Sequence, residues 1–434
     1  MKYTAPSSTD PRARPTPFTF YPPKNNSLVT WLVQMGIRSS IRRKLRVTEI
    51  EISDDDLETL RRLKGERCLL TPSHSGGFEP HIIMYLSKLL GEQFNFVAAM
   101  ELFERSRINR WLMPRMGVYS IIRGAVDRQS FSMTRQLLAS GKRRLVIFPE
   151  GEAIWQNSVV LPFQQGVFQL AFKGYQDAEK ETGPTHLYCV PIAIKYTYLQ
   201  DMHGEIDASL TRLESKLDLS NEASKATRYR RLRQIVESVV AANEKANDFK
   251  PAAESDLGDR AEQLKLHAIR HLEQKLGLTP TNRQTMLDRI RALFNAVDHI
   301  VHEEPSGSEY ERQLATERQN AVKEHYDALW RLLQFSALHD GYVKKSMTFE
   351  RFLDVLCLLE MEVCKERKIW GPRMARIKVG QPVDLKDHIS DYNSDKRGTL
   401  QAVTMLLETS VSKMLEDLET ECQLVSDTAE NSVG

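Results

Sequence analysis

Between Arg67 and Tyr196, short apolar runs alternate with segments whose apolar residues recur at helical spacing. Residues 67–71 (RCLLT) have the pattern of a buried strand, and residues 187–196 form a longer apolar run of the same kind. This alternation is typical of parallel strands that lie side by side and are covered by helices. We therefore predict an α/β domain with a largely parallel sheet flanked by helices.

The same patterns set the expected elements along the chain. The predicted strands lie at residues 67–71, 94–99, 118–122, 145–148 and 187–196, and the predicted helices at residues 54–64, 81–90, 103–113, 131–139 and 167–175. From about residue 207 to 365 the pattern is almost entirely helical, with long charged amphipathic runs. A strand pattern returns at 375–379, and an amphipathic helix follows at 396–418. We interpret the helical stretch as an insertion that splits one α/β domain.

The expected organisation follows from these patterns. It comprises a disordered Pro-rich N-terminus (1–25), a basic amphipathic helix (26–46), the first part of the α/β domain (47–203), a helical insertion (204–366), a closing strand and helix (367–420) and a tail (421–434).

Composition excludes several classes of protein. A net charge of +2 gives no global signal for nucleic-acid binding, so we predict no nucleic-acid partner. The five cysteines are scattered and odd in number, which favours reduced thiols over a disulfide framework. The chain has no run of about 18 apolar residues, and its first residues lack the apolar core of a secretory signal. We expect a cytoplasmic protein, peripheral on the inner membrane face if it handles lipid.

His74 and Glu79 form the first candidate site, in a segment that follows the first predicted strand. Pro80 disfavours helical geometry at Glu79 and suits the first turn of a helix, so Glu79 is expected where the next helix begins. Gly76 and Gly77 let the loop fold back, so that the imidazole can reach the carboxylate. A carboxylate on one ring nitrogen leaves the other nitrogen to take a proton from a hydroxyl. The pair is a candidate general base with its orienting group.

Two further segments include the end of a predicted strand and the residues that follow it. One runs from Gly117 to Arg123, and a guanidinium beside a glycine can grip a phosphate with two parallel hydrogen bonds. The other reads Phe148, Pro149, Glu150 and Gly151. Its Glu150 is a candidate acceptor of hydrogen bonds from substrate hydroxyls, or a partner for a basic residue.

Open α/β sheets bind ligands at the carboxyl ends of their strands, where all three segments are expected to meet. Taken singly, each segment has a structural explanation. A His and a Glu at this spacing are expected about once by chance in a chain with eleven histidines. A single arginine usually lies on the protein surface. A Pro-Glu-Gly turn can form without any functional role. Their order together favours a site that moves an acyl group onto a hydroxyl.

The ordered set resembles that of the glycerolipid acyltransferases, which acylate glycerol 3-phosphate or lysophosphatidic acid in phospholipid synthesis. The hallmark blocks of that family are His-x4-Asp, Gly-x5-Arg, Phe-Pro-Glu-Gly and a later Val-Pro. They look like His74 to Glu79, Gly117 to Arg123, Phe148 to Gly151, and Val190-Pro191. The resemblance covers about residues 60–200 and 370–420.

By this resemblance, His74 deprotonates an acceptor hydroxyl that attacks an acyl thioester directly, without an acyl-enzyme intermediate, and Glu79 orients His74. Arg123 and the loop of Glu150 and Gly151 hold the acceptor's phosphate and glycerol backbone. The expected co-substrate is acyl-CoA or an acyl carrier protein thioester, and the expected acceptor is a lysophospholipid. This chemistry requires no metal and no bound cofactor.

Two positions depart from the family pattern. Glu79 stands where Asp is usual, which lengthens the side chain by one methylene. Glu152 and Ala153 stand where Thr-Arg is common, which removes a cation near the acceptor. Two rival interpretations therefore stay open: a non-catalytic member that binds lipid or a partner protein, and an acyl thioester hydrolase that uses the same base with water.

Features outside these blocks leave several alternatives. The helix expected at 26–46 carries a basic run and lies either on an anionic membrane surface or on the α/β domain with a solvated basic end. The apolar residues of 105–115, around Trp111, either border the acyl entrance or pack in the core, and we expect core packing. For the helical insertion three roles stay open: covering the acyl channel, self-association, or binding an acyl carrier protein. Histidine pairs at 267/271 and 299/302 lack further ligands of a recognisable zinc site, so we predict no metal site.

Overall fold

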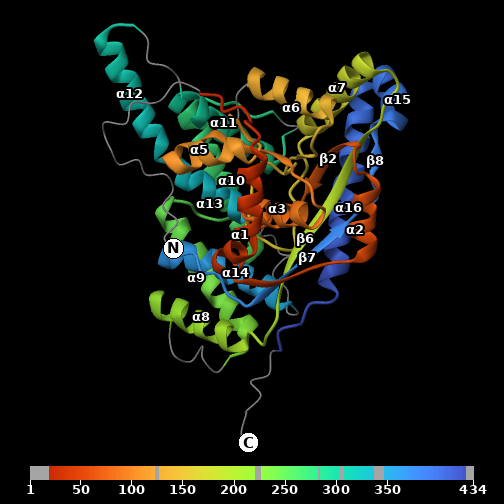
Figure 1. Cartoon of the computed structure of the whole chain (residues 1–434). Coiled ribbons are helices and arrows are strands. Elements are labelled where there is room, and N and C mark those ends of the chain that lie inside the picture. Colours follow the sequence, from red (N-terminus) through yellow and green to blue (C-terminus); the bar gives the residue numbers. More distant parts are fainter. Residues whose placement is uncertain are drawn as a thin grey trace, which may run out of the picture.

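The computed structural model describes residues 19–122, 127–219, 226–281, 284–302, 307–336 and 347–426. Within these ranges, an eight-stranded sheet forms the centre of the α/β part (Figure 1). The strand order is β1–β7–β6–β2–β5–β3–β4, and β8 pairs with β6 outside this path. The predicted α/β class with a largely parallel sheet is confirmed.

The strands are β1 (Val47–Ile52), β2 (Arg67–Pro72), β3 (Asn95–Ala99), β4 (Val118–Ile121), β5 (Leu145–Val146), β6 (Leu187–Tyr198), β7 (Arg373–Val379) and β8 (Val383–Asp384). From β6 through β2, β5 and β3 to β4, all neighbours are parallel. β7 is antiparallel to β6 and parallel to β1, so the strand that follows the helical region lies between β1 and the rest of the sheet.

Helices cover both faces of the sheet. Those of the first part are α1 (Ser27–Leu45), α2 (Asp54–Arg62), α3 (Glu79–Leu89), α4 (Met100–Glu104), α5 (Arg107–Arg115), α6 (Arg128–Ser140) and α7 (Gln165–Thr182). Cys68 and Leu70 of β2 belong to the core beneath α1, α2 and α3, whereas Leu69 belongs to the core beneath α6, α7 and α16 (Lys396–Glu419). A strand buried on both faces reads as a continuous apolar run, which is why β2 was recognisable in the sequence.

The helical region has cores of its own. It comprises α8 (His203–Lys216), α9 (Arg228–Ala246), α10 (Leu257–Leu276), α11 (Met286–His302), α12 (Glu309–Lys323), α13 (His325–Ser336) and α14 (Phe349–Cys364). α8, α9 and α14 share one core. α10, α11 and α13 share another, which includes Ile154 and Leu161 from the loop between β5 and α7. The helical region therefore packs directly on a loop of the sheet. After β8, a 3₁₀ helix (Leu385–His388) and α15 (Ile389–Ser394) lead to α16.

Some local predictions need correction. β1 was not predicted, because its alternating pattern places Glu49 and Glu51 toward solvent on a half-buried strand. The helix expected at 103–113 is two helices, α4 and α5, because the side chain of Ser106 accepts the N–H of Asn109 and starts a new helix there.

The segment 19–25, assigned to the disordered N-terminus, is ordered and packs beside β4. The N–H of Tyr21 donates to Ser120 Oγ at 2.8 Å, the N–H of Ser120 donates to the Tyr21 carbonyl at 3.1 Å, and the Tyr21 ring stacks on Phe103. These contacts satisfy backbone groups that a disordered segment would leave to water. The prediction for 1–25 is therefore wrong for these residues, and residues 1–18 lie outside the described ranges.

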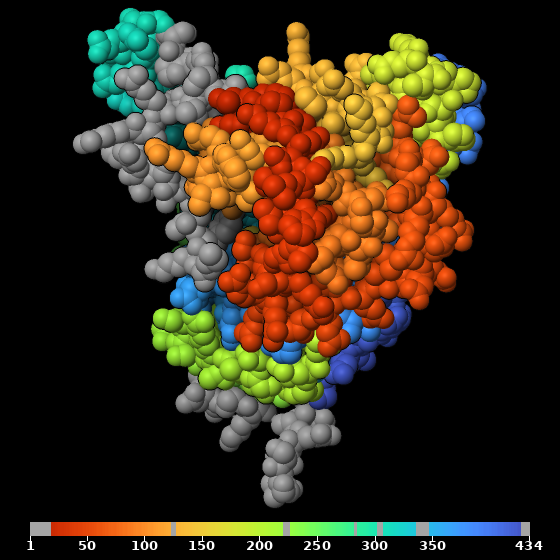
Figure 2. Space-filling view, in the orientation of Figure 1, coloured from red at the N-terminus to blue at the C-terminus, as the bar shows by residue number. Residues whose placement is uncertain are grey.

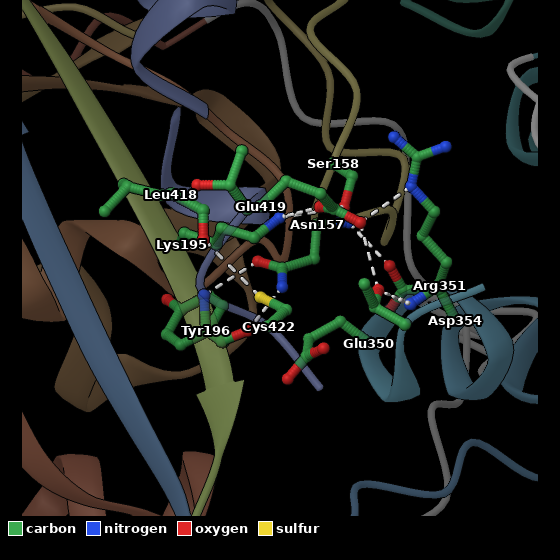
Figure 3. A network of polar contacts seen from close by, with 12 residues as sticks. Asn157, Ser158, Lys195, Tyr196, Glu350, Arg351, Asp354, Leu418, Glu419 and Cys422 are labelled. Atoms are coloured by element: carbon green, nitrogen blue, oxygen red, sulfur yellow. Dashed lines mark hydrogen bonds and ion pairs between the residues drawn. The ribbon is translucent and has the colours of Figure 1, made fainter. Parts of the chain in front are cut away.

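A buried polar network joins the sheet, the helical region and the end of α16 (Figure 3). The fully buried Lys195 of β6 forms an ion pair with Glu419 and donates to Ser158 Oγ at 2.9 Å. Glu419 also accepts from Arg351 Nε at 2.8 Å and from Thr348 Oγ1 at 3.0 Å, both from the start of α14. Because a buried ammonium needs a charged partner to offset its lost hydration, this contact holds three distant segments together.

Glu419→Ala should lower the free energy of unfolding more than Lys195→Met does. The first change leaves the Lys195 ammonium buried without the carboxylate, a loss of about 3 kcal/mol. The second removes the buried charge, while Arg351 still pairs with Glu419. Urea unfolding of both variants and of the double variant measures this, and the double variant should recover part of the Glu419→Ala loss. Equal losses in the two single variants would contradict the pairing.

Candidate active site

His74 lies beyond the carboxyl end of β2, and Glu79 is the first residue of α3. Glu79 Oε2 lies 2.9 Å from His74 Nδ1. Glu79 is fully buried, whereas the His74 side chain keeps 17% of its surface exposed. The intervening loop turns at Gly77, whose φ is +77°, so that residues five apart can meet. With Nδ1 bound to the carboxylate, the neutral imidazole carries its lone pair on Nε2.

The second oxygen of Glu79, Oε1, has its own donors. It accepts from the N–H of Gly76 at 2.7 Å and from the hydroxyl of Tyr196 at 3.1 Å. Burial acts to raise the pKa of Glu79, but the contact with His74 and the backbone N–H donors outweigh it and hold the pKa below its usual value. The carboxylate is therefore ionised although it is buried.

Glu150, in the loop after β5, is the second fully buried carboxylate of this region. Its Oε1 accepts from the backbone N–H of His74 at 2.7 Å, and its Oε2 accepts from the N–H of Leu161 at 2.8 Å. Burial raises the pKa of Glu150 to about 7, although both backbone donors act against this rise. The glutamate thus fixes the main chain of His74 in place.

The neighbours of Glu150 shape the same loop. The Phe148 ring stacks on the His74 imidazole, with ring centroids 4.3 Å apart. The N–H of Gly151, at a φ of +79°, donates to the Phe148 carbonyl, and the N–H of Gln164 donates to the Pro149 carbonyl. Phe148 limits how the imidazole can rotate, while Pro149 and Gly151 turn the chain beneath it.

The segment that carries this geometry matches a known family. Residues 49–195 match the protein-family model described as Acyltransferase. These residues form an acyltransferase domain. The match supports the predicted assignment to the glycerolipid acyltransferase family, and with it a general acyltransferase activity. A search of curated proteins returned no match for the chain.

Two predicted substrate contacts of the acyltransferase domain need correction. Glu150 is fully buried and each of its oxygens accepts a backbone N–H, so this side chain is not exposed to substrate hydroxyls. Gly117 precedes β4 and lies at the amino edge of the sheet, opposite to His74. A Cβ at Gly117 would lie 2.6 Å from the Oδ1 atoms of both Asn25 and Asn95, so the absence of a side chain serves packing. Arg123 lies outside the described residues, and its role remains a prediction.

A pocket adjoins the loop between His74 and Glu79, and residues that follow α14 also line it. Three of these residues are cations: Arg367, Lys368 and Arg373. The Arg367 guanidinium lies over the rings of Trp155, at 4.2 Å, and Phe78, at 5.3 Å, and donates to the Gly76 carbonyl at 3.2 Å. Positive charge from beyond the matched segment therefore lies beside the acyltransferase domain's loop.

Sequence reasoning missed Tyr196 and Arg367. β2 ends at Pro72, paired with Ile192, and β6 continues to Tyr198 over the loop that bears His74. The length of the apolar run at 187–196 was the available signal for Tyr196. Nothing in the sequence placed Arg367 beside this loop. No group of three or more His, Cys, Asp or Glu side chains able to hold a metal ion occurs in the part of the chain that the structure describes.

The raised pKa of Glu150 should make stability depend on pH. Between about pH 4.5 and 7, the folded chain binds more protons at this site than the unfolded chain does. The contribution is complete below the unfolded pKa and is lost as pH rises through the folded one. Because Glu150→Gln lacks this titration, its unfolding free energy relative to the parent should improve by about 1–3 kcal/mol over this window. Urea unfolding at several pH values measures the difference, which would stay constant if the pKa were not raised.

Proposed function

We propose that the protein transfers a fatty acyl group from acyl-CoA or an acyl carrier protein thioester to the hydroxyl of a lysophosphatidic acid-like glycerolipid. One observation carries the proposal. It is the contact between His74 Nδ1 and the ionised, buried Glu79, within a segment that matches the acyltransferase family. This contact leaves Nε2 as the ring nitrogen that can take a proton.

In this proposal His74 is the general base. As the acceptor oxygen attacks the carbonyl carbon of the thioester, its proton moves to Nε2, and the imidazolium is stabilised at Nδ1 by Glu79. When the tetrahedral intermediate collapses, the C–S bond breaks and the leaving thiolate takes the proton from Nε2. The lowered pKa of Glu79 fits this role, because the carboxylate must stay ionised while the imidazole is charged.

Positive charge is proposed to hold the anionic substrates. Arg123 is assigned the acceptor's phosphate, as the family pattern implies. The departure at Glu152-Ala153 removes a cation from the loop after Gly151, and Arg367 lies against Trp155 of this same loop. The segment after α14 thus offers a replacement for the missing charge.

The geometry of Glu79 favours an active enzyme over a catalytically lapsed member of the family. The longer side chain at this position still brings Oε2 to 2.9 Å from the imidazole, so the departure from Asp does not break the pair. A thioester hydrolase would use the same base with water as the nucleophile. Product analysis separates hydrolysis from transfer.

His74→Ala should lower kcat for acyl transfer about a thousandfold, because it removes the base, while the fold is retained. The assay follows a radiolabelled acyl thioester into lysophosphatidic acid and measures released fatty acid with and without acceptor. His186→Ala is a matched control, since His186 also pairs with a carboxylate, Asp384, but outside the site.

Full activity in His74→Ala would exclude this residue as the base. Fatty acid release by the parent that is independent of acceptor would favour the hydrolase.

We further propose that α1 and α5 attach the protein to an anionic membrane surface. α1 packs on the sheet through Ile37, Ile41 and Leu45, and its remaining face leaves four large apolar side chains at least half exposed: Leu28, Trp31, Leu32 and Met35. α5, which contacts α1, exposes Ile108 and Trp111, so the prediction that Trp111 packs in the core is wrong. Figure 2 shows both helices on one face.

Charge and length fit attachment at the surface of a bilayer. The basic run of α1 includes Arg42, Arg43 and Lys44 in its last turn, which suits anionic headgroups. None of the helices within the described ranges is both long enough and apolar enough to cross a membrane. The exposed face of α1 and α5 is therefore proposed to lie in the interfacial layer.

The double variant Trp31→Ser/Leu32→Ser should bind vesicles of anionic phospholipid at least tenfold more weakly, because it removes apolar area from the contact. Co-sedimentation with these vesicles measures binding. Tyr310→Ser/Leu314→Ser is the matched control, since α12 also exposes these apolar side chains but lies in the helical region. Equal binding by the two double variants would contradict the assignment of this face.

A further inference from the structure

The carboxylate of Glu79 is held from the side opposite His74 by Tyr196. The Tyr196 hydroxyl lies 3.1 Å from Glu79 Oε1, and both residues are buried. Burial, and then the charge of Glu79, raise the pKa of Tyr196 far above its usual value, so the phenol stays protonated. Because an ionised carboxylate only accepts hydrogen bonds, the phenol is the donor.

Tyr196 is itself held by the side chain of Asn157. The N–H of Tyr196 donates to Asn157 Oδ1 at 2.8 Å, and Asn157 Nδ2 donates to the Tyr196 carbonyl. The amide therefore binds both backbone groups of Tyr196, as a neighbouring strand would (Figure 3). This pairing fixes the backbone from which the phenol reaches Glu79.

Asn157 is in turn held by the helical region. Its backbone N–H donates to Oδ2 of Asp354, on α14, at 2.7 Å. A continuous series of hydrogen bonds thus leads from α14 through Asn157 and Tyr196 to Glu79. Tyr196 and Asp354 both lie beyond the segment that matches the acyltransferase family, which ends at residue 195.

We propose that Tyr196 is a positioning residue, through which Asn157 and Asp354 let the helical region set the orientation of the His74–Glu79 pair. This inference rests on the proposed function. Glutamate has one more rotatable bond than aspartate, so its carboxylate must be held on both oxygens to face the imidazole. Tyr196 and the N–H of Gly76 hold Oε1, which directs Oε2 to His74.

Loss of the phenol hydroxyl should change the base and leave substrate binding intact. With one donor fewer on Oε1, more of the negative charge of Glu79 acts on the imidazole, and the carboxylate is less firmly oriented. The acidic limb of the pH–rate profile should then move to higher pH. Glu150, the other carboxyl group beside His74, keeps its bond to the His74 backbone in this variant, so the shift reports on Glu79. Because the hydroxyl is buried against Glu79, KM for both substrates should change little.

Tyr196→Phe tests this with an isosteric change. We expect a fall in kcat of about tenfold, together with the shift of the acidic limb. Tyr198→Phe is the matched control, because it removes a hydroxyl two residues along the same side of β6 without removing a bond to Glu79. A Tyr196→Phe profile that superimposes on the parent, or falls by the same factor at every pH, would overturn the proposal.

A double-mutant cycle tests whether Tyr196 acts through Glu79. In a Glu79→Ala background, Tyr196→Phe should cause no further loss, because the carboxylate that it positions is gone. Asp354→Ala should shift the acidic limb in the same direction as Tyr196→Phe, by a smaller amount. Additive losses in the cycle would show that the phenol acts elsewhere.

An NMR measurement, which does not depend on catalytic activity, distinguishes failure of this inference from failure of the proposed function. The proton shared by His74 Nδ1 and Glu79 should give a downfield ¹H resonance, assigned by its absence in His74→Ala. It should move in Tyr196→Phe and stay in place in Tyr198→Phe. A shift in a protein without transferase activity would keep the positioning role and reject the reaction, whereas an unmoved resonance in an active enzyme would reject only the positioning role.

Discussion

The hydrogen bond from the backbone N–H of His74 to the buried carboxylate of Glu150 joins the loop after β2 to the loop after β5. Burial away from water destabilises the ionised form of a carboxylate, and this is why the pKa of Glu150 is raised. The same carboxylate fixes the main chain of His74, and the side chain of His74 meets Glu79. Glu150 therefore fixes the position of the His74 backbone, and Glu79 fixes the orientation of its imidazole ring.

Local patterns were enough to predict most of the sheet and the His74–Glu79 contact, because each depends on residues near one another in the chain. The strand β2, the glycines of the loop and the start of α3 at Glu79 all lie within a short stretch. Gly117 was misplaced because a glycine before a strand lies at the amino edge, whereas ligands are expected at the carboxyl edge. The contact between Tyr196 and Glu79 spans 117 positions, and only the pairing of β2 with β6 in the folded sheet brings the two residues together.

Side chains of the helical region hold the loop after β5, which carries Glu150. Arg291 of α11 donates to the carbonyls of Glu150 and Pro162, at 2.8 and 3.0 Å, and Gln334 of α13 donates to the Ala153 carbonyl at 3.0 Å. Ile154 and Leu161 of the same loop are buried in the core of α10, α11 and α13. The loop that carries Glu150 therefore packs against both the sheet and the helical region. A change in the packing of these helices would move Glu150, and with it the backbone of His74.

The position of β7 has a consequence for how the chain is made. β1 pairs only with β7 among the strands that the structure describes, and β7 lies between β1 and β6. On the ribosome, the sheet cannot close until the whole helical region has been synthesised. Until then β6 presents an open apolar edge, and such edges pair readily with other chains. Early folding of the helices, or a chaperone, would have to shield this edge during translation.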